Sequence, residues 1–367
     1  MTKPKRAEAS LTGKDNTKVA ASEDLPLASV VVASYNGLDM TRRCLDSLAD
    51  QDYRPKEIIV VDNGSTEDIQ GMVRNDFPDA RLIRLESNLG FAGGYNCGIE
   101  AAQGRYIAII NNDAIASTGW LSALVAAVEE DDSIGAVASI IEDGNKPGTL
   151  DSCGVGIAFD GMSRQAQRGE PVPTLTEPME VLMPSGCACL YRSEALDVTG
   201  LFDEDFFAYC EDTDLGLRLR WAGYRTVVAP GSTVTHYYSM TSGKFSLKKV
   251  YWVERNHLWV LIKNYPATLI ATAPFVTVWR YLVQVYAVTM KSGDMKGFAG
   301  ELPVFRTLYT LVCANIAALA GALRMLRKRL EFKPKRRINA RTMGRIISEH
   351  KLSMYEIITG KTSHAGQ

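Results

Sequence analysis

The stretch Tyr106-Ile-Ala-Ile-Ile-Asn-Asn-Asp113 indicates the fold. Its first five residues are aromatic, β-branched or small and apolar, which predicts a buried strand of a parallel sheet. Ligands bind beyond the carboxyl ends of strands in an open α/β sheet, so we expect Asn111, Asn112 and Asp113 to face a crevice. A carboxylate beside amide oxygens suits a hard divalent cation and therefore a phosphate-bearing substrate. A polar turn without chemistry is the alternative for these three residues.

Strands and helices alternate around this stretch. Apolar runs at 27–33, 57–62 and 81–85 predict three further strands, and the segments between them have the spacing or the glycine-opened start of helices. This order is typical of an α/β fold with a mostly parallel, Rossmann-like sheet, helices on both faces and right-handed connections.

The composition fits one large catalytic domain with an appendage. The 367 residues are 46% hydrophobic and carry a net charge of -1, which excludes disordered and fibrous classes and gives no global signal for nucleic-acid binding. The seven cysteines are scattered and odd in number, which indicates a reducing compartment. We expect a disordered tail at 1–26, the catalytic domain at 27–263, a membrane-associated helical region at 264–330 and a basic tail at 331–367.

Two apolar runs and a basic run follow the predicted catalytic domain. Residues 264–279 are apolar but contain two prolines and are cut by Arg280, and residues 307–323 form a second uncharged run. Both are shorter than the roughly 20 residues of an unambiguous membrane span. The basic run from Arg324 to Arg345 favours contact with an anionic membrane surface on the cytoplasmic side. We expect interfacial helices or a shallow hairpin there, with nucleic-acid binding or a merely solvated helix as alternatives.

Six short motifs follow one another in a fixed order: Ser34-Tyr35-Asn36, Val61–Ser65, Asn88–Asn96, Asn111-Asn112-Asp113, Glu211–Asp214 and His236. This ordered set resembles the family 2 inverting glycosyltransferases, and within them the branch that transfers rhamnose or galactofuranose. The resemblance covers residues 27–263. It implies a GT-A fold, a nucleotide-sugar donor and transfer with inversion at the anomeric carbon.

The donor is expected at the strand ends. Asp62 can accept hydrogen bonds from the base or the ribose, as acidic residues do at such strand ends. The glycines after Asn88 would let the backbone approach the diphosphate at a helix N-terminus, although a glycine-rich helix entry that serves only packing is the alternative. The expected donor-binding residues are Ser34, Tyr35, Asn36, Asp62, Asn88, Gly93, Gly94, Asn96, Asn111 and Asn112.

The segment at Asn111 occupies the place of the family's metal-binding Asp-x-Asp motif, with an amide in the first position. The resemblance implies that Asp113 carries the charge, that Asn111 supports it and that His236 is a further ligand. The metal would be Mg²⁺ or Mn²⁺, bridging the two phosphates and stabilising the leaving diphosphate. Most single histidines are structural or surface residues, which is the alternative for His236.

Asp212 is the predicted catalytic base, because an inverting transferase needs a carboxylate that takes the proton of the acceptor hydroxyl. From the residues alone, Glu211 and Asp214 are also candidates. The resemblance favours Asp212, with Glu211 binding acceptor or donor hydroxyls and Asp214 capping the helix. Carboxylates this close are expected to raise the pKa of at least one of them. On the acceptor side we expect Trp120, Ser185, Gly186 and Glu211, with core packing as the alternative for Trp120.

The sequence therefore predicts a metal-assisted transferase on the cytoplasmic face of a membrane. It would move rhamnose, or as a second choice galactofuranose, to a polyprenyl-linked or glycan acceptor in bacterial cell-envelope polysaccharide synthesis. A catalytically silent nucleotide-sugar-binding module is one alternative, because Asn111 replaces a carboxylate. A sugar nucleotidyltransferase, which shares the sheet and the metal, is the other. No nucleic-acid partner is expected, and the oligomeric state is left open.

Overall fold

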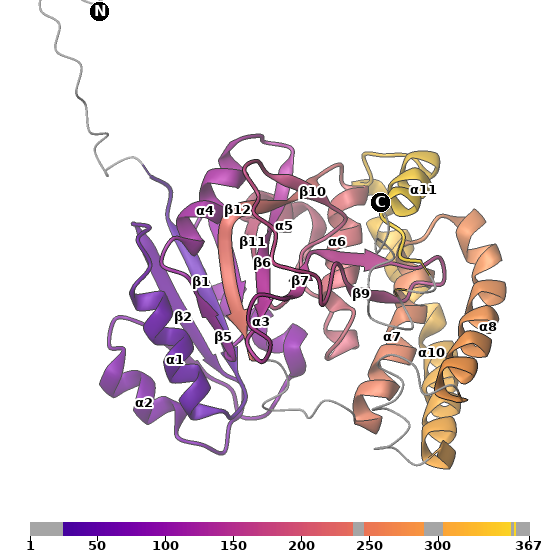
Figure 1. The fold of residues 1–367 in the computed structure, drawn as a ribbon, viewed down its shortest axis with the longest axis horizontal. Coiled ribbons are helices and arrows are strands. Elements are labelled where there is room, and N and C mark those ends of the chain that lie inside the picture. The colour runs from indigo at the N-terminus through magenta and orange to yellow at the C-terminus, as the bar shows by residue number, and fades with distance from the viewer. Residues whose placement is uncertain (1–24, 238–245, 290–303, 354–355, 357–367) are drawn as a thin grey trace, which may run out of the picture.

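The computed structural model describes residues 25–237, 246–289, 304–353 and 356 (Figure 1). Nearly all of the tail predicted at 1–26, and the end of the basic tail beyond residue 356, lie outside the described residues. Within them, ten strands form one mixed sheet in the order β10-β12-β6-β11-β4-β1-β2-β3, with β5 paired to β12 and β7 paired to β6. A second, two-stranded sheet joins β8 (Val155–Ile157) and β9 (Ser163–Gln165).

The parallel half of the sheet contains the strands predicted from the apolar runs. These are β1 (Ala28–Ser34), β2 (Lys56–Asp62), β3 (Arg81–Arg84) and β4 (Tyr106–Ile110). All five residues of β4 are buried, as a strand covered on both faces requires. β11 (Ala188–Arg192) pairs antiparallel with β4 and with β6 (Ile134–Asp143), so the sheet is parallel only in part.

Helices cover both faces of the sheet, which confirms the predicted fold class. Val30 and Val32 of β1 belong to a cluster with α1 (Leu38–Ala49), α2 (Ile69–Asp76) and α4 (Trp120–Glu129). Val31, whose side chain points to the opposite face, packs with α3 (Gly90–Ala101), α5 (Ser193–Thr199) and α6 (Glu211–Trp221).

The long strand β12 (Arg225–His236) carries a predicted metal ligand to the site. It runs parallel to β6, with a register shift between Val228 and Thr233, and its end pairs antiparallel with β5 (Ala114–Ala116). This pairing sets His236 opposite Ala114, the residue after Asp113. The remaining strands, β7 (Leu150–Cys153) and β10 (Met179–Val181), pair at β6 and β12.

Four helices gather at one end of the molecule: α7 (Leu247–Asn264), α8 (Ala267–Thr289), α10 (Val304–Phe332) and α11 (Ala340–Glu349) (Figure 1). Trp259 of α7 and Met325 of α10 share a hydrophobic cluster with Trp221 of α6. The helical region therefore packs directly on the catalytic domain.

The apolar run that Arg280 cuts forms a continuous helix, although its prolines argued against one. The helix α8 continues through Pro274 and Arg280 to Thr289. It can do so because the Arg280 guanidinium is fully buried, with Nε 2.8 Å from Asp160 Oδ2 and Nη1 3.0 Å from Glu254 Oε1. In water-excluded surroundings, paired carboxylates compensate its charge.

The helix α10 is longer than the apolar run predicted at 307–323. Together with the residues that follow, Phe305–Lys335 is long and apolar enough to cross a membrane. The exposed large hydrophobic side chains of the described residues all lie on α8 and α10, except Leu25, Tyr35 and Leu89.

Some basic side chains of the predicted basic run bind other residues of this protein and are therefore not available to bind lipid headgroups. Lys328 Nζ lies 2.6 Å from Asp205 Oδ2, and Arg324 Nη1 lies 2.9 Å from Asp205 Oδ1. Arg329 donates to the carbonyl of Tyr265 at 2.6 Å. Arg327 is far more open, with 81% of its side chain exposed.

Candidate functional site

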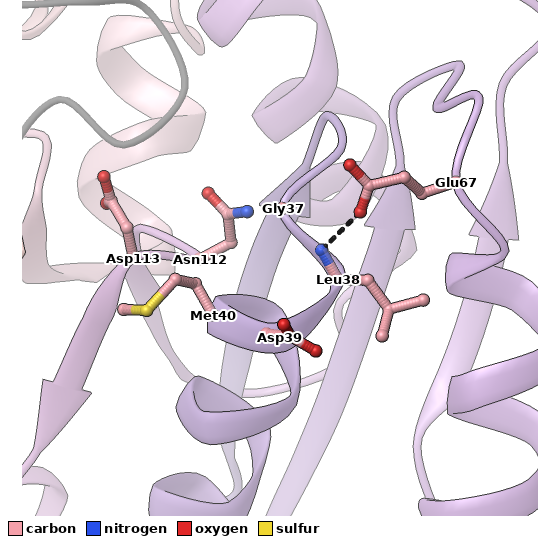
Figure 2. A pocket seen from close by; sticks show the side chains of 7 residues that line it. All are labelled: Gly37, Leu38, Asp39, Met40, Glu67, Asn112 and Asp113. Atoms are coloured by element: carbon pink, nitrogen blue, oxygen red, sulfur yellow. Dashed lines mark hydrogen bonds between the residues drawn. The ribbon is translucent and has the colours of Figure 1, made fainter.

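A cavity of about 420 Å³ lies beyond the carboxyl ends of β1 and β4, where the sequence predicts a crevice. It is lined by Gly37, Leu38, Asp39, Met40, Glu67, Asn112 and Asp113 (Figure 2). Glu67 comes from the loop after β2, and its Oε2 accepts the Leu38 N–H at the start of α1 at 2.7 Å. Only Asn112 and Asp113 of this lining were predicted as site residues.

Asn112 joins two loops at this edge of the sheet. Its Nδ2 donates to Thr41 Oγ1 at 3.0 Å, to the Asn36 carbonyl at 3.2 Å and to Ser34 Oγ at 3.3 Å. Asn36 in turn accepts the Thr66 N–H through Oδ1 at 2.9 Å. The loops after β1, β2 and β4 are thus held together by side-chain amides.

Two of the predicted donor-binding residues are buried under these loops. Ser34 and Asp62 have no exposed surface, and Asp62 accepts the Ser65 N–H at 3.0 Å while pairing with Arg84. Their polar atoms have partners within the protein, and their direct contact with the donor stays a prediction. Tyr35 is 43% exposed and stays available to a ligand.

Asp113 and His236 face each other at the cavity wall. His236 Nε2 lies 3.2 Å from Asp113 Oδ1, and its Nδ1 lies 2.8 Å from Asp151 Oδ2. Burial opposes a charge on His236, yet the neighbouring Cys187, Asp113 and Asp151 raise the pKa of His236 well above its ordinary value. Asp151 was missed from the sequence, where an isolated aspartate in a loop-rich segment gives no signal. Asn111 uses its Oδ1 to accept the Tyr95 hydroxyl at 3.2 Å.

Asp212 lies in the first turn of α6 and is partly exposed. Its Oδ2 accepts the Gly186 N–H at 3.1 Å and its Oδ1 accepts the Thr213 N–H at 2.6 Å. Burial raises the pKa of Asp212 above its ordinary value, although these N–H groups oppose the shift. The carboxylate is thus fixed in orientation and made more basic, as a proton acceptor requires.

The two acidic neighbours of Asp212 differ from it. Glu211 is buried, its Oε2 has no hydrogen-bond partner among the described residues, and burial beside Asp212 raises the pKa of Glu211 well above its ordinary value. Asp214 is fully buried and pairs with Arg218 and with Lys263, each at 2.9 Å. Asp214 therefore forms a buried ion network rather than the helix cap that was expected.

The loop that leads into α6 has an unusual backbone. Phe207, Tyr209 and Cys210 all have φ between 64° and 69°, a left-handed conformation that costs a non-glycine residue about 1–2 kcal/mol. Asn256 of α7 holds this loop through Nδ2, which donates to the carbonyls of Tyr209 at 2.7 Å, Ala208 at 2.9 Å and Phe206 at 3.0 Å. The adjacent Arg255 donates to the Phe206 carbonyl at 3.0 Å.

The profile of the family described as Glycosyl transferase family 2 matches residues 29–200. The chain carries a family 2 glycosyl transferase domain. The matched residues run from β1 to the end of α5 and include Asp113 and the cavity lining. The matched region ends before Asp212, His236 and helices α7 to α11, which lie further along the chain.

Named relatives of the family 2 domain include enzymes that act on lipid-linked sugars. The N-acetylglucosaminyl-diphospho-decaprenol L-rhamnosyltransferase of Mycobacterium tuberculosis is 27% identical over 239 residues, which is 59% of this chain and 77% of that protein. A β-1,3-glucosyltransferase of Escherichia coli that uses UDP-Glc and α-D-GlcNAc-diphosphoundecaprenol is 36% identical over 91 residues, 24% of this chain and 36% of its own length. The chain also spans 38% of the length of an uncharacterised glycosyltransferase of Haemophilus influenzae, at 32% identity and over 33% of this chain.

Solved structures support the fold of the family 2 domain. GalNAc-T7 with UDP, GalNAc and Mn²⁺ superposes with a TM-score of 0.55 at 17% identity, over 67% of this chain and 49% of that chain. TarS of S. aureus superposes with a TM-score of 0.51 at 19% identity, over 83% of this chain and 55% of that one. The architecture is that of the GT-A glycosyltransferases.

The glycine-rich helix α3 of the family 2 domain serves packing, the alternative that the sequence left open. A Cβ on Gly94 would lie 2.8 Å from Asn63 Nδ2, and a Cβ on Gly93 would lie 2.7 Å from the Leu89 Cβ. Asn96 is buried and exchanges hydrogen bonds with the backbone of Phe202. Asn88 accepts the Gly90 N–H at 2.7 Å. Gly93, Gly94 and Asn96 thus have packing roles, and their contact with the donor stays a prediction.

The residues predicted on the acceptor side have structural contacts, and acceptor binding by Ser185 and Gly186 stays a prediction. Trp120 is fully buried under the sheet and donates its indole N–H to Ser139 at 2.8 Å, so it belongs to the core. Ser185 is buried and accepts the Cys187 N–H at 3.3 Å. A Cβ on Gly186 would lie 2.9 Å from the Phe91 ring, and the Gly186 N–H holds Asp212. Gly186 thus positions the carboxylate.

Proposed function

We propose that this protein is an inverting glycosyltransferase of cell-envelope polysaccharide synthesis, with Asp212 as the catalytic base. The observation that carries the proposal is the connection between the two polar centres. Gly186 donates its N–H to Asp212, and the carbonyl of the next residue, Cys187, accepts the Asn111 N–H at 2.7 Å. One short segment therefore fixes the base relative to the strand end that bears Asp113.

The cavity beside Asp113 suits a nucleotide-diphosphate sugar. Tyr35 is exposed at the end of β1, and Asn36 and Asn112 lie on the loops that border the opening. The first turn of α1 forms part of the lining, and the N-terminus of a helix favours an anion. Rhamnose is the first choice of sugar, supported by the mycobacterial relative, and galactofuranose is the second.

Asp113 and His236 would hold a divalent metal, with Asn111 nearby. A carboxylate and an imidazole suit Mn²⁺ or Mg²⁺, and the described residues hold no group of three or more His, Cys, Asp or Glu that would complete a metal site alone. Two protein ligands leave positions for phosphate oxygens of the donor. Such an ion, when bound, stabilises the negative charge on the departing nucleoside diphosphate.

In this mechanism Asp212 takes the proton of the acceptor hydroxyl. The oxygen forms a bond to the anomeric carbon from the face opposite the nucleotide, and the bond from that carbon to the diphosphate oxygen breaks. One displacement of this kind inverts the configuration. The N–H groups of Gly186 and Thr213 keep the carboxylate oriented throughout.

The acceptor is a polyprenyl-diphosphate-linked glycan, which two relatives use according to their names. Such an acceptor is embedded in lipid, and α8 and α10 carry the apolar surface to meet it. Nucleotide sugars are made in the cytoplasm, so the domain would work at the cytoplasmic face of the membrane, with exposed basic side chains such as Arg341 near anionic headgroups.

The test is nucleoside diphosphate release from UDP-, dTDP- and GDP-sugars by membranes that contain the full-length protein and a lipid-linked acceptor, with and without EDTA. We expect release from one donor, its loss in EDTA, and its loss in Asp212→Asn, whereas Asp197→Asn on the surface of α5 retains it. Pyrophosphate release from a nucleoside triphosphate would identify a nucleotidyltransferase instead. Donor binding without release would identify a silent binding module.

A further inference from the structure

A second cavity, of about 500 Å³, lies between α7 and α10. Its lining combines two arginines, one tryptophan and three small residues: Arg255, Trp259, Ala317, Ala320, Gly321 and Arg324. Of these residues only Arg324 was given a role from the sequence, as part of the basic run, and none of them lines the cavity beside Asp113. The helices α7 and α10 run side by side here, because a Cβ on Gly321 would lie only 2.6 Å from the Trp259 ring.

Arg255 presents a cation that forms no salt bridge with any of the described residues. Its guanidinium is stacked 4.2 Å from the centre of the Trp259 ring, and burial lowers the pKa of Arg255. In the part of the chain that the structure describes, no carboxylate lies within salt-bridge distance of its guanidinium, which donates to the backbone carbonyls of Asp205 and Phe206 and to the Asn256 amide oxygen. A partly buried charge without an opposite charge favours an anionic ligand.

Arg324 adds a second cation at the same cavity. Its side chain is 52% exposed and pairs with Asp205 Oδ1, but the same carboxylate also binds Lys328. Asp203 beside it is likewise shared, between Lys263 and Lys328. The carboxylates here are therefore already neutralised, and the arginines of the cavity leave an excess of positive charge.

The cavity also adjoins an apolar surface. Ile316 and Leu323, one turn before and one turn after Ala320 on α10, are 61% and 80% exposed. Arg255, which also lines the cavity, donates to the Phe206 carbonyl in the loop that leads to Asp212. A molecule with an anionic group, an apolar tail and a sugar can therefore contact all three features.

We propose that the cavity between α7 and α10 binds the diphosphate of a prenyl-diphosphate-linked acceptor. The prenyl chain lies along the exposed face of α10, and the sugar attached to the diphosphate extends past the Phe206 loop to Asp212. This inference rests on the proposed transferase function for the role of Asp212. The two arginines supply the charge-assisted hydrogen bonds that phosphate oxygens accept.

The probe is farnesyl diphosphate, titrated into the purified full-length protein by calorimetry. Arg324→Gln should weaken its binding about tenfold, the effect of one lost contact of about 1.4 kcal/mol. Ala320→Leu should weaken it as well, because an exposed alanine is replaced by a side chain that fills the cavity without disturbing the core. The matched control is Arg327→Gln, which removes the same charge from an exposed position of the same helix and should bind normally.

Three results would overturn the site: equal binding by Arg324→Gln and Arg327→Gln, equal affinity for farnesol and farnesyl diphosphate, or a parallel loss of binding to phosphatidylglycerol vesicles. The last would show that the arginines meet lipid headgroups in general. Nucleoside diphosphate release with a lipid-free acceptor separates this proposal from the transferase function. If Arg324→Gln still releases nucleoside diphosphate and still binds farnesyl diphosphate normally, only the proposed diphosphate site in the cavity is rejected. If farnesyl diphosphate binds specifically but no nucleoside diphosphate is released, the proposed transferase function is rejected.

Discussion

His236 and Asp151 form a buried pair, with 2.8 Å between Nδ1 and Oδ2. The other ring nitrogen points to Asp113 at 3.2 Å, so the imidazole is held between two carboxylates. A carboxylate behind a histidine fixes the ring orientation and raises its basicity, which is the usual support of a metal-binding histidine. Asp151 thus acts on the candidate metal site through His236.

Asp151→Asn should lower the affinity for Mn²⁺ by about 10-fold to 100-fold, because the amide is a weaker partner for the ring N–H. Electron paramagnetic resonance of free Mn²⁺ measures this without any turnover. Asp197→Asn, on the exposed side of α5, is the control and should bind Mn²⁺ normally. An unchanged Mn²⁺ affinity in Asp151→Asn would mean that His236 is not a ligand.

Glu211→Gln should change how stability depends on pH. The folded state raises the pKa of Glu211, so its contribution to stability is complete below the ordinary glutamate pKa and is lost as the pH rises through the folded value. Glutamine does not ionise, so Glu211→Gln does not lose stability in this pH range. At pH 8 it should have a larger free energy of unfolding than wild type. Urea unfolding from pH 4 to 9 tests the sign, with exposed Glu194→Gln as control. Identical pH profiles for Glu211→Gln and wild type would contradict a raised pKa of Glu211 in the folded protein.

Asn256→Ala should lower kcat about tenfold and leave the KM for the donor unchanged. The loop before Asp212 loses its three hydrogen bonds, so Asp212 is less well oriented and the activation free energy rises by about 1.4 kcal/mol. Steady-state kinetics separate the two parameters. Asn145→Ala, in an exposed turn, should leave both unchanged. A rise in KM for the donor with unchanged kcat would contradict the positioning role.

Arg280→Met should lower the free energy of unfolding by about 3–5 kcal/mol, because it leaves Asp160 and Glu254 buried without their cation. Thermal or urea unfolding of the detergent-solubilised protein measures the loss. The comparison variant is Arg345→Met, whose side chain is 71% exposed and which should cost less than about 1 kcal/mol. Equal stability of the two variants would argue against α8 being anchored by Arg280.

Leu323→Glu should reduce association with vesicles of phosphatidylglycerol and phosphatidylcholine. The side chain is 80% exposed on α10, so the change leaves the core intact but places a charge on the apolar surface. Flotation on a density gradient compares it with wild type and with Ala49→Glu, an exposed position on α1 at the opposite end of the molecule (Figure 1). Full flotation of Leu323→Glu would exclude α10 from the membrane contact.

The sequence by itself determined the main strands and the order in which the candidate site residues follow them along the chain. Apolar runs such as Tyr106–Ile110 predicted the strands, because they are short, rich in β-branched and aromatic residues, and apolar at every position, as a strand covered on both faces is. Polar residues directly after these strands predicted the cavity beside Asp113, and the acidic cluster at Asp212 predicted the carboxylate at the start of α6. All of these are local signals that a few consecutive residues carry.

Only the tertiary structure decided which side chains are free. Trp120 and Asn96 look available in the sequence but are buried by elements far away in the chain. Three residues with important partners carry no local signal. The partner of Asp151 lies 85 positions away in the chain, those of Asn256 lie 47 to 50 positions away, and those of Arg280 lie up to 120 positions away. Burial and the pairing of charges are properties of the packed chain, so residues that act through distant neighbours become visible only after folding.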